Sequence, residues 1–308
     1  MSAPRSAAVP IIRRQALAPS AFVDEFIRQN QPVVVTDAMS SWPALRDWTP
    51  ERFRERFGDE KVQIYDDLFF MVSARPLKDY LDRYILNVDV TERSLKRTPY
   101  VRWYSRQDER NDFPWSDDVF DRISSDWSRP YFMPDRDLIL PHTPADSRAD
   151  PVTNLFPARG VFISACGART RLHVDPWASD AVLCQAYGQK RFVLFPPQDV
   201  PALLRDGKLM DLQFDPSADT WTLPCAPFAD DCLMPGEAIF IPAGWAHAFY
   251  STTPSISVTW NFVHQASSER WAAYLAAGVP VSERRSLDFF HSGSVSPMVS
   301  PERTSLPG

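Results

Sequence analysis

The second half of the chain alternates short apolar runs with turn residues at close and regular spacing. From about residue 158, β-branched and aromatic residues gather in short runs that clusters of Gly, Pro, Asn and Asp separate. This pattern is typical of antiparallel strands and favours a barrel or jelly roll over a fold of alternating strands and helices. The expected strands cover residues 160–165, 171–175, 181–186, 191–195, 238–241, 248–250 and 255–263.

The first third of the chain mixes helical and strand patterns. Residues 18–30 predict a short amphipathic helix with Ser20 as its N-cap and with Phe22, Phe26 and Ile27 on one face. The other expected elements are a strand at 32–36, a helix from Thr49-Pro50 to about Gly58, a strand at 61–65, a helix near 77–86 and a strand at 99–104.

A chain of 308 residues is long enough for one large domain with a substantial core. The expected organisation is a flexible tail at 1–10, one domain at 11–264 with its barrel core at about 158–264, and a C-terminal part at 265–308. Residues 106–150, rich in Asp, Ser, Pro and Trp, predict long loops with at most one short helix. An amphipathic helix at 268–277 is a candidate homodimer contact, and packing on its own barrel is an equal alternative.

Composition and charge narrow the class of partner. The chain is 44% hydrophobic and 13% aromatic, which indicates a folded globule, and 29 Pro against 10 Gly favour short strands and rigid loops. A net charge of −6 argues against binding nucleic acid or a membrane surface. No apolar run approaches the ~18 residues of a membrane span and no secretory signal is evident, so we expect a cytoplasmic protein. The four cysteines form no Cys-x-x-Cys pair and predict reduced, buried thiols.

The chemistry of the chain centres on the stretch Thr170-Arg171-Leu172-His173-Val174-Asp175. On a strand, His173 and Asp175 would project from the same face, because successive side chains alternate. A neighbouring imidazole and carboxylate supply two ligands of the two-histidine, one-carboxylate triad that binds Fe(II) and leaves positions open. The motif is too short to be specific by itself, and a metal site also requires a third ligand.

The third ligand is expected from a distant strand, because facing strands of a barrel lie far apart in sequence. His247 fits this expectation, since a Pro-Gly turn, an apolar strand at 238–241 and a Pro-x-Gly-Trp turn lead directly to it. A lone histidine near a core is usually structural. The chain has only five histidines, and His142, His264 and His291 lack such a setting and are interpreted as ordinary.

Two further patterns place polar groups among apolar ones. Lys190 shares a strand face with Phe192 and Leu194, so it either points inward, where it needs an anion, or reaches out to water. In the strand at 255–263, Ser and Thr residues and Asn261 alternate with large apolar residues. Such alternation usually marks a solvent face. In a barrel that holds a polar cosubstrate, it would instead place Thr259 and Asn261 near the site.

Taken together and in order, these motifs resemble the JmjC-like, cupin-type 2-oxoglutarate oxygenases, particularly their asparaginyl-hydroxylase-like branch. The resemblance runs from about residue 11 to residue 263. The motifs that carry it are Thr170-x-x-His173-x-Asp175, Gly188-x-Lys190-Arg191 through Pro196-Pro197, Pro235-Gly236-Glu237 through Pro242-x-Gly244-Trp245-x-His247, and Val258-x-x-Asn261-Phe262.

The resemblance implies a mainly β fold: a double-stranded β-helix with an N-terminal α/β flank and a short C-terminal helical tail. It implies a dioxygenase that uses Fe(II), 2-oxoglutarate and O2 to hydroxylate an unactivated C–H bond. The implied iron ligands are His173, Asp175 and His247. The implied 2-oxoglutarate residues are Lys190 for the distal carboxylate, helped by Thr170 and Tyr100, with Asn261 beside the cosubstrate and the metal.

Several alternatives stay open at this point. A protein side chain is the first choice of substrate and a small molecule or natural product the second, whereas histone demethylation is disfavoured because no reader domain or zinc cluster accompanies the barrel. A cupin with other metal chemistry would not need Lys190 and Thr170, and a non-catalytic interaction protein would tolerate the loss of His173 or Asp175. Asp180-Ala181 stands where the family often has an asparagine, so the substrate side is expected to differ.

Overall fold

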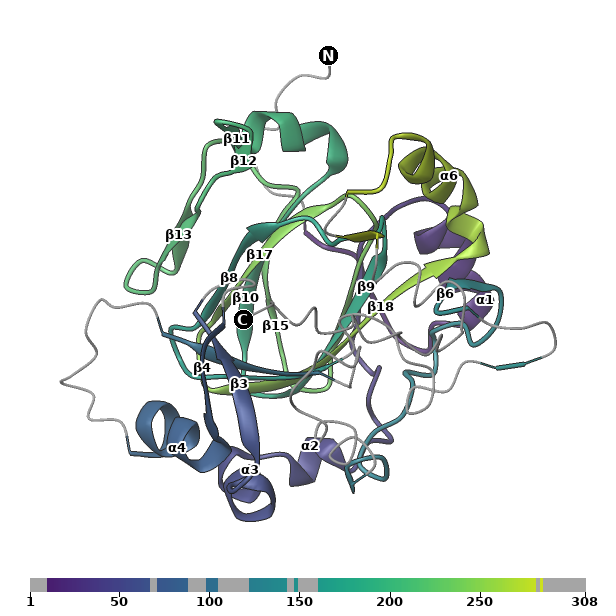
Figure 1. Cartoon of the computed structure of the whole chain (residues 1–308). Helices are drawn as coiled ribbons and strands as arrows, with labels where there is room; N and C mark the ends of the chain where they lie inside the picture. The colour runs from purple at the N-terminus through teal and green to yellow at the C-terminus, as the bar shows by residue number, and fades with distance from the viewer. Residues whose placement is uncertain are drawn as a thin grey trace, which may run out of the picture.

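Two β-sheets from the second half of the chain face each other (Figure 1). The computed structural model describes residues 10–66, 71–87, 98–104, 122–142, 147–148, 160–280 and 283–284. The first sheet contains, in spatial order, β16 (Ala238–Ile241), β9 (Asp180–Tyr187), β18 (Ser255–His264) and β7 (Gly160–Ser164). The second contains β15 (Ala229–Leu233), β10 (Lys190–Phe195), β17 (Ala246–Ser251) and β8 (Arg169–His173). These neighbours all pair antiparallel, which is the arrangement of a double-stranded β-helix.

A layer of apolar side chains between the two sheets holds them together. Leu183 and Ile239 from the first sheet pack with Phe192, Leu194 and Phe249 from the second. Every one of these residues alternates along its strand with a residue that faces the other way, so each sheet turns one apolar face inward. The polar groups inside the barrel lie beside this layer.

The N-terminal part of the chain extends the first sheet at both ends. The strands β1 (Arg13–Arg14) and β2 (Val33–Val35) continue it beyond β16, and β5 (Tyr100–Tyr104), β3 (Lys61–Tyr65) and β4 (Met71–Pro76) continue it beyond β7. The short strand β6 (Leu138–Leu140) pairs with β18. The flank also contains α1 (Pro19–Ala21), η1 (Phe22–Ile27), α2 (Ala44–Asp47), α3 (Pro50–Phe57), α4 (Leu77–Leu81) and η2 (Asp82–Leu86). These elements form the expected α/β flank.

The flank buries the outer face of the first sheet. Trp260 of β18 packs against Trp42, with ring centroids 6.0 Å apart, and against Trp127, with centroids 5.3 Å apart. The apolar residues of β18 therefore face the flank, and its polar residues face the inside of the barrel. The alternation in this strand reflects two buried environments rather than a solvent face.

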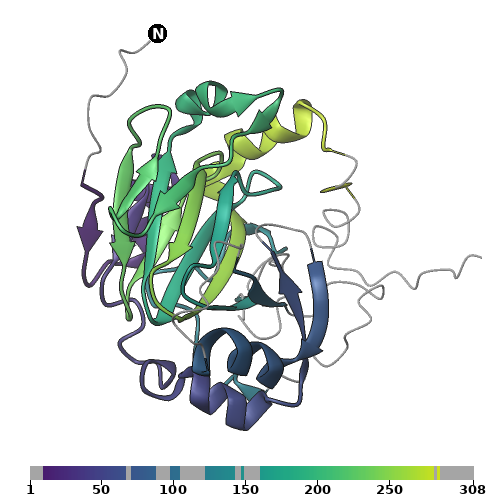
Figure 2. The ribbon, with the colours of Figure 1, turned by 90° about the vertical axis from the view of Figure 1, so that its left-hand side faces the viewer.

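The C-terminal helix lies at the opposite end of the molecule from α3 and α4. Figure 2 shows α3 and α4 (blue) at one end, and α6 (Ser268–Ala276, yellow) at the other. Trp271 of α6 is buried against Leu140 and Val263, so this side of the helix packs on its own barrel.

Between β10 and β15 the chain forms η4 (Pro197–Leu203), β11 (Leu204–Arg205), β12 (Lys208–Leu209), β13 (Gln213–Asp215) and β14 (Thr220–Thr222). The short helix η5 (Gln265–Ser267) precedes α6.

Two local expectations from the sequence are wrong. Ser20 is not an N-cap: Ala18 occupies that position, and Ser20 lies inside α1, because Pro19 takes the first helical position. The strand expected at 171–175 spans Arg169–His173. Asp175 therefore follows the strand rather than belonging to it, and Pro176, which lacks a backbone N–H, comes next.

The expectation of buried thiols is only partly correct. All four cysteines are free, but only Cys184 is buried, and burial raises the pKa of its thiol. No helix among the residues that the structure describes is long and apolar enough to cross a membrane. Residues 1–9 of the expected tail, His291 and about half of the loops expected at 106–150 lie outside the described residues.

Candidate metal centre

Three side chains converge where β8 and β17 lie side by side. His173 is the last residue of β8 and stands directly opposite His247 of β17, with ring centroids 4.1 Å apart. Asp175 lies two residues past the end of β8, with Oδ1 3.6 Å from His173 Nε2 and Oδ2 3.9 Å from His247 Nε2. One ligand atom from each residue lies within 4.8 Å of the others. The structure thus brings together the three predicted ligands.

The backbone fixes how both imidazoles present their nitrogens. His173 Nδ1 lies 2.9 Å from the carbonyl oxygen of Arg171, and His247 Nδ1 lies 3.1 Å from that of Trp245. A carbonyl oxygen only accepts hydrogen bonds, so Nδ1 carries the proton in both rings. Each Nε2 therefore presents its lone pair towards the Asp175 carboxylate, which is the tautomer that binds a metal.

Electrostatics favour the protonation states that metal ligation needs. Burial lowers the pKa of His247 to about 4, with a further contribution from His173, so this imidazole is neutral near pH 7. Burial raises the pKa of the Asp175 carboxyl, but His247, His173 and a hydrogen bond from Asn261 outweigh it and bring the pKa to about 2. A carboxylate and a neutral imidazole are electron-pair donors suited to a cation site.

Asn261 of β18 connects Asp175 to the chain that follows it. Asn261 hydrogen-bonds to Asp175, and its Nδ2 also donates to Ser179 Oγ at 2.9 Å. Ser179 Oγ in turn donates to the carbonyl oxygen of Pro176 at 2.8 Å. The asparagine is therefore held in place beside the predicted ligands, as expected for a group that orients a metal-binding carboxylate.

Lys190 points into the barrel rather than out to water. Its side chain is buried at 5% exposure, Nζ donates to Ser257 Oγ at 2.8 Å, and Nζ lies 6.0 Å from the centroid of the Phe162 ring. Burial lowers the pKa of this ammonium to about 7. A lysine in this setting recovers its full charge when an anion binds next to it.

A bulge brings Thr170 to the face of the strand that carries His173. On β17, His247 and Phe249 are two residues apart and share a face, and their partners on β8 are His173 and Thr170, three residues apart. The extra residue on β8 is a β-bulge, which turns Thr170 to the same side as His173. The alternation of a regular strand would have placed it on the opposite face.

Tyr100 of β5 is buried beside the barrel, and Arg102 of the same strand lies near it. The Tyr100 ring lies 6.4 Å from the Phe162 ring, and Arg102 packs over the rings of both Phe162 and Tyr65, at 5.3 Å from each centroid. Arg102 is 6% exposed. Burial lowers its pKa, and Tyr100, Tyr65 and Asp175 act against that effect.

Arg102 and Ser257 are buried polar groups that the sequence pattern did not identify. Arg102 follows Tyr100 by two residues on a strand, and this spacing is the signal that could have placed both on one face. Ser257 belongs to the polar side of β18 and contacts Lys190 across the barrel. Of the remaining histidines, His264 accepts a hydrogen bond from the backbone N–H of Ala266 and caps η5, which fits an ordinary role.

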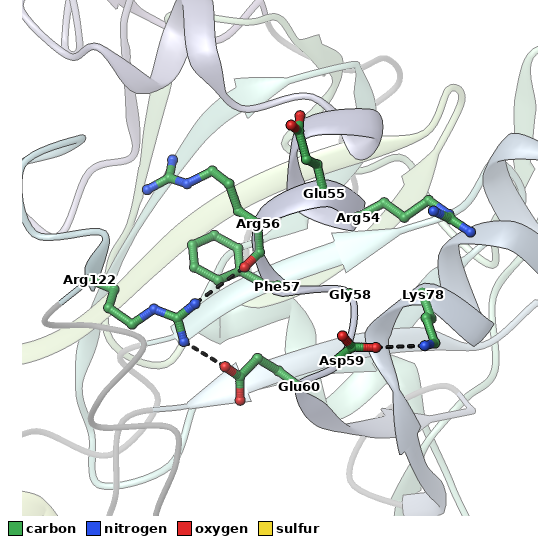
Figure 3. Close-up of a pocket in the computed structure, with 9 residues that line it drawn as sticks. All are labelled: Arg54, Glu55, Arg56, Phe57, Gly58, Asp59, Glu60, Lys78 and Arg122. Atoms are coloured by element: carbon green, nitrogen blue, oxygen red, sulfur yellow. Dashed lines mark hydrogen bonds and ion pairs between the residues drawn. The ribbon is translucent and has the colours of Figure 1, made fainter.

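A surface pocket of about 530 Å³ lies between α3 and α4, at the flank end of the molecule (Figure 3). Its lining consists of Arg54, Glu55, Arg56, Phe57, Gly58, Asp59, Glu60, Lys78 and Arg122. Arg122 donates to Glu60, and Lys78 pairs with Asp59 (Figure 3). These charges already satisfy one another, and the lining includes none of the three predicted metal ligands.

The fold and this cluster define the class of protein: a double-stranded β-helix with a two-histidine, one-carboxylate site at the edge of its second sheet. The chain belongs to the cupin-like domain family, whose sequence model matches residues 19–268. This match confirms the resemblance to cupin-type, JmjC-like proteins.

Several proteins are similar in sequence to this chain over most of its length. Lysine-specific demethylase JMJ21 of Arabidopsis thaliana is 27% identical over 79% of the chain and 24% of its own length. The bifunctional arginine demethylase and lysyl-hydroxylase psr-1 of Caenorhabditis elegans is 27% identical over 78% of the chain and 58% of its own. The 2-oxoglutarate and iron-dependent oxygenase JMJD4 of Mus musculus is 23% identical over 79% and 58%. The part of each relative that matches this chain thus makes up between about a quarter and three fifths of that relative's length.

Proposed function

We propose that this protein is an Fe(II)- and 2-oxoglutarate-dependent dioxygenase that hydroxylates a C–H bond of a protein side chain. The observation that carries the proposal is the convergence of two Nε2 lone pairs and the Asp175 carboxylate in the barrel that also encloses the Lys190 ammonium. A set of three metal ligands alone would fit many cupins. A buried cation as a second feature fits a dianionic cosubstrate that bridges the metal and the lysine.

In this proposal the residues of the chain have distinct tasks. His173, Asp175 and His247 hold Fe(II), and the bound iron supplies the oxidising chemistry together with 2-oxoglutarate and O2. Lys190 pairs with the distal carboxylate of 2-oxoglutarate, and Ser257 keeps its ammonium directed inward by accepting its hydrogen bond. The Thr170 hydroxyl and the Tyr100 phenol complete the cosubstrate site from β8 and β5.

Other residues orient the metal ligand Asp175 and keep water out of the barrel. Asn261 holds the Asp175 carboxylate in place through the hydrogen bond between them. The apolar layer between the sheets excludes water from the interior of the barrel, which strengthens the electrostatic contacts made there. We assign the catalytic unit to residues 11–264, as the sequence pattern predicts.

The choice of a protein side chain rests on the relatives. The names of several of them refer to lysine or arginine residues as the groups acted upon, by demethylation or by lysyl hydroxylation. Hydroxylation of an N-methyl carbon leads to demethylation, so one oxidation chemistry covers both outcomes. The chain spans only part of these proteins, and its own substrate therefore needs a direct search.

The experiment incubates Fe(II)-loaded protein with 2-oxoglutarate in air and a peptide library of proteomic origin. Succinate formation and peptide masses are measured beside the Asp175→Ala variant. Succinate that depends on Asp175, with peptides gaining 16 Da or losing 14 Da, supports the proposal. Succinate without any modified peptide contradicts the protein-substrate part, and the absence of 2-oxoglutarate consumption by folded, metal-loaded protein contradicts the oxygenase itself.

A further inference from the structure

The loop that follows Asp175 has an unusual backbone. Trp177 has φ +58° and Ala178 has φ +44°, so two consecutive residues with Cβ atoms lie in the left-handed region. This conformation is unfavourable for such residues and persists where the surroundings impose it. The loop begins one residue after a predicted metal ligand, so whatever imposes its shape also restricts Asp175.

Glu283 makes two contacts that hold Trp177 in this loop and a third with Tyr274. Its Oε2 accepts a hydrogen bond from the backbone N–H of Trp177 at 2.9 Å, and its carbonyl oxygen accepts one from Trp177 Nε1 at 3.2 Å. The same Oε2 accepts a hydrogen bond from the Tyr274 hydroxyl at 2.6 Å. Hydrogen bonds to an ionised carboxylate are among the stronger ones in proteins. Trp177 is thus held by both its backbone and its side chain.

The barrel in turn anchors Tyr274. The Tyr274 ring stacks on Trp271 of the same helix, with centroids 5.5 Å apart, and Trp271 is buried against Leu140 and Val263. Tyr274, Trp177 and these residues form one apolar cluster. Glu283 is therefore fixed to the outer side of the barrel, and its hold on Trp177 has a rigid base.

The other end of the loop is also held from the C-terminal side. Asp180 is fully buried, and its Oδ2 accepts from the hydroxyl of Ser267, just before α6, at 3.3 Å. Its Oδ1 accepts from the backbone N–H of Ala243 at 2.9 Å, in the turn that leads to His247. Contacts from the C-terminal part of the chain thus reach both segments that carry the predicted ligands.

Tyr274 and Glu283 lie beyond residue 268, where the match to the cupin-like domain family ends. We propose that Glu283 is a positioning residue for the metal centre: it holds the Trp177–Ala178 backbone in its left-handed conformation and so fixes Asp175 for metal binding. This inference rests on the metal-binding part of the proposed function. The C-terminal part of the chain thereby becomes a structural component of the site.

The test compares wild type with Glu283→Ala, Glu283→Gln and Tyr274→Phe, and uses Glu269→Ala as a matched control. Glu269 is exposed on α6, so its replacement removes the same charge from the same region. Co(II) is the metal probe, followed by its visible absorption, because this readout needs no turnover. Hydrogen exchange at the Trp177 amide reports the loop directly, and a thermal melt of each variant checks the fold.

We expect Glu283→Ala to weaken Co(II) binding about tenfold, the lower end of the effect of losing a group that supports a metal ligand. The Trp177 amide should exchange faster in this variant. Glu283→Gln keeps an acceptor for the Trp177 N–H and should bind Co(II) nearly as wild type does. Tyr274→Phe should fall between these two variants, and Glu269→Ala should match wild type.

Wild-type Co(II) affinity in Glu283→Ala would overturn the inference, as would unchanged exchange of the Trp177 amide. A loss of affinity that Glu283→Gln shares in full would also contradict it, because the retained acceptor should rescue the loop. These outcomes are separate from a failure of the proposed function. If wild type binds Co(II) but the Fe(II) protein does not consume 2-oxoglutarate, the oxygenase proposal fails while the role of Glu283 stands.

Discussion

Replacing Lys190 by Met should weaken 2-oxoglutarate binding and, at the same time, stabilise the protein without ligand. Burial lowers the pKa of the Lys190 ammonium from 10.5 to about 7. At about 1.36 kcal/mol for each pKa unit, this corresponds to a free-energy cost of about 5 kcal/mol for the buried charge. Apolar residues of similar volume in place of buried charges leave stability unchanged or raise it by about 1–4 kcal/mol. We expect a gain in this range.

The effect on the cosubstrate has the opposite sign. An ion pair with hydrogen bonds to a charged group contributes about 1.5–3 kcal/mol. Losing it should raise the dissociation constant of 2-oxoglutarate roughly 10- to 100-fold. Urea unfolding of the ligand-free protein measures the stability change, and calorimetric titration with 2-oxoglutarate measures the affinity. Lys208→Met is the matched control, because Lys208 is exposed on β12 and should change neither quantity.

The stability gain should also depend on pH. The native pKa of Lys190 is below its unfolded value, so between about pH 7 and 10.5 the unfolded chain binds a proton that the native protein lacks. The stability of wild type therefore rises with pH across this window, and the Met variant lacks this contribution. The advantage of Lys190→Met should be largest at pH 7 or below and should shrink as the pH rises. A variant that is less stable than wild type at pH 7 and binds 2-oxoglutarate normally would refute this reasoning.

Three further predictions concern the cosubstrate and the fold. The dissociation constant of 2-oxoglutarate should rise about tenfold for each pH unit above about 7, because binding requires a proton on Lys190, and a flat profile between pH 7 and 9 would argue against its role. Trp260→Ala should lower the free energy of unfolding by about 3–5 kcal/mol, measured in urea, because two other tryptophans pack on that ring. Gly188→Ala should lower the stability of the protein far more than Gly207→Ala. Both glycines have positive φ, but a Cβ at Gly188 would lie 1.8 Å from a backbone carbonyl oxygen, whereas a Cβ at Gly207 would meet nothing within 4 Å. Equal unfolding midpoints for the two glycine variants would contradict the clash.

Features with a local signature could be predicted from the sequence. The strands of the barrel follow from runs of β-branched and aromatic residues between Gly and Pro turns, and both β3 and β16 match their expected bounds. The helix α3 follows from Thr49, which caps it by accepting from the Arg52 N–H, and from Pro50 at its first position. His173 and His247 could be predicted as ligands of one metal because each lies at an end of an expected strand and the chain has few histidines.

Features that depend on distant contacts could not be predicted. The strand β15 has the polar sequence Ala-Asp-Asp-Cys-Leu, and only the fold shows that its two ends are buried between the sheets and that Asp230 pairs with Arg191 on the neighbouring strand. Thr170 faces inward only because of a bulge, which has no signature in the alternation of apolar residues. The hold of Glu283 on Trp177 joins residues more than a hundred positions apart, and only the folded barrel brings them together.

The most direct test of the oxygenase proposal is an anaerobic titration of the protein with Fe(II) and then 2-oxoglutarate, followed by visible absorption. Chelation of 2-oxoglutarate by Fe(II) produces a metal-to-ligand charge-transfer band. We predict this band in wild type, its loss in Asp175→Ala, and its appearance only at much higher 2-oxoglutarate in Lys190→Met. Folded, Fe(II)-loaded wild-type protein that shows no band at saturating 2-oxoglutarate would contradict the account and would favour a cupin with other metal chemistry.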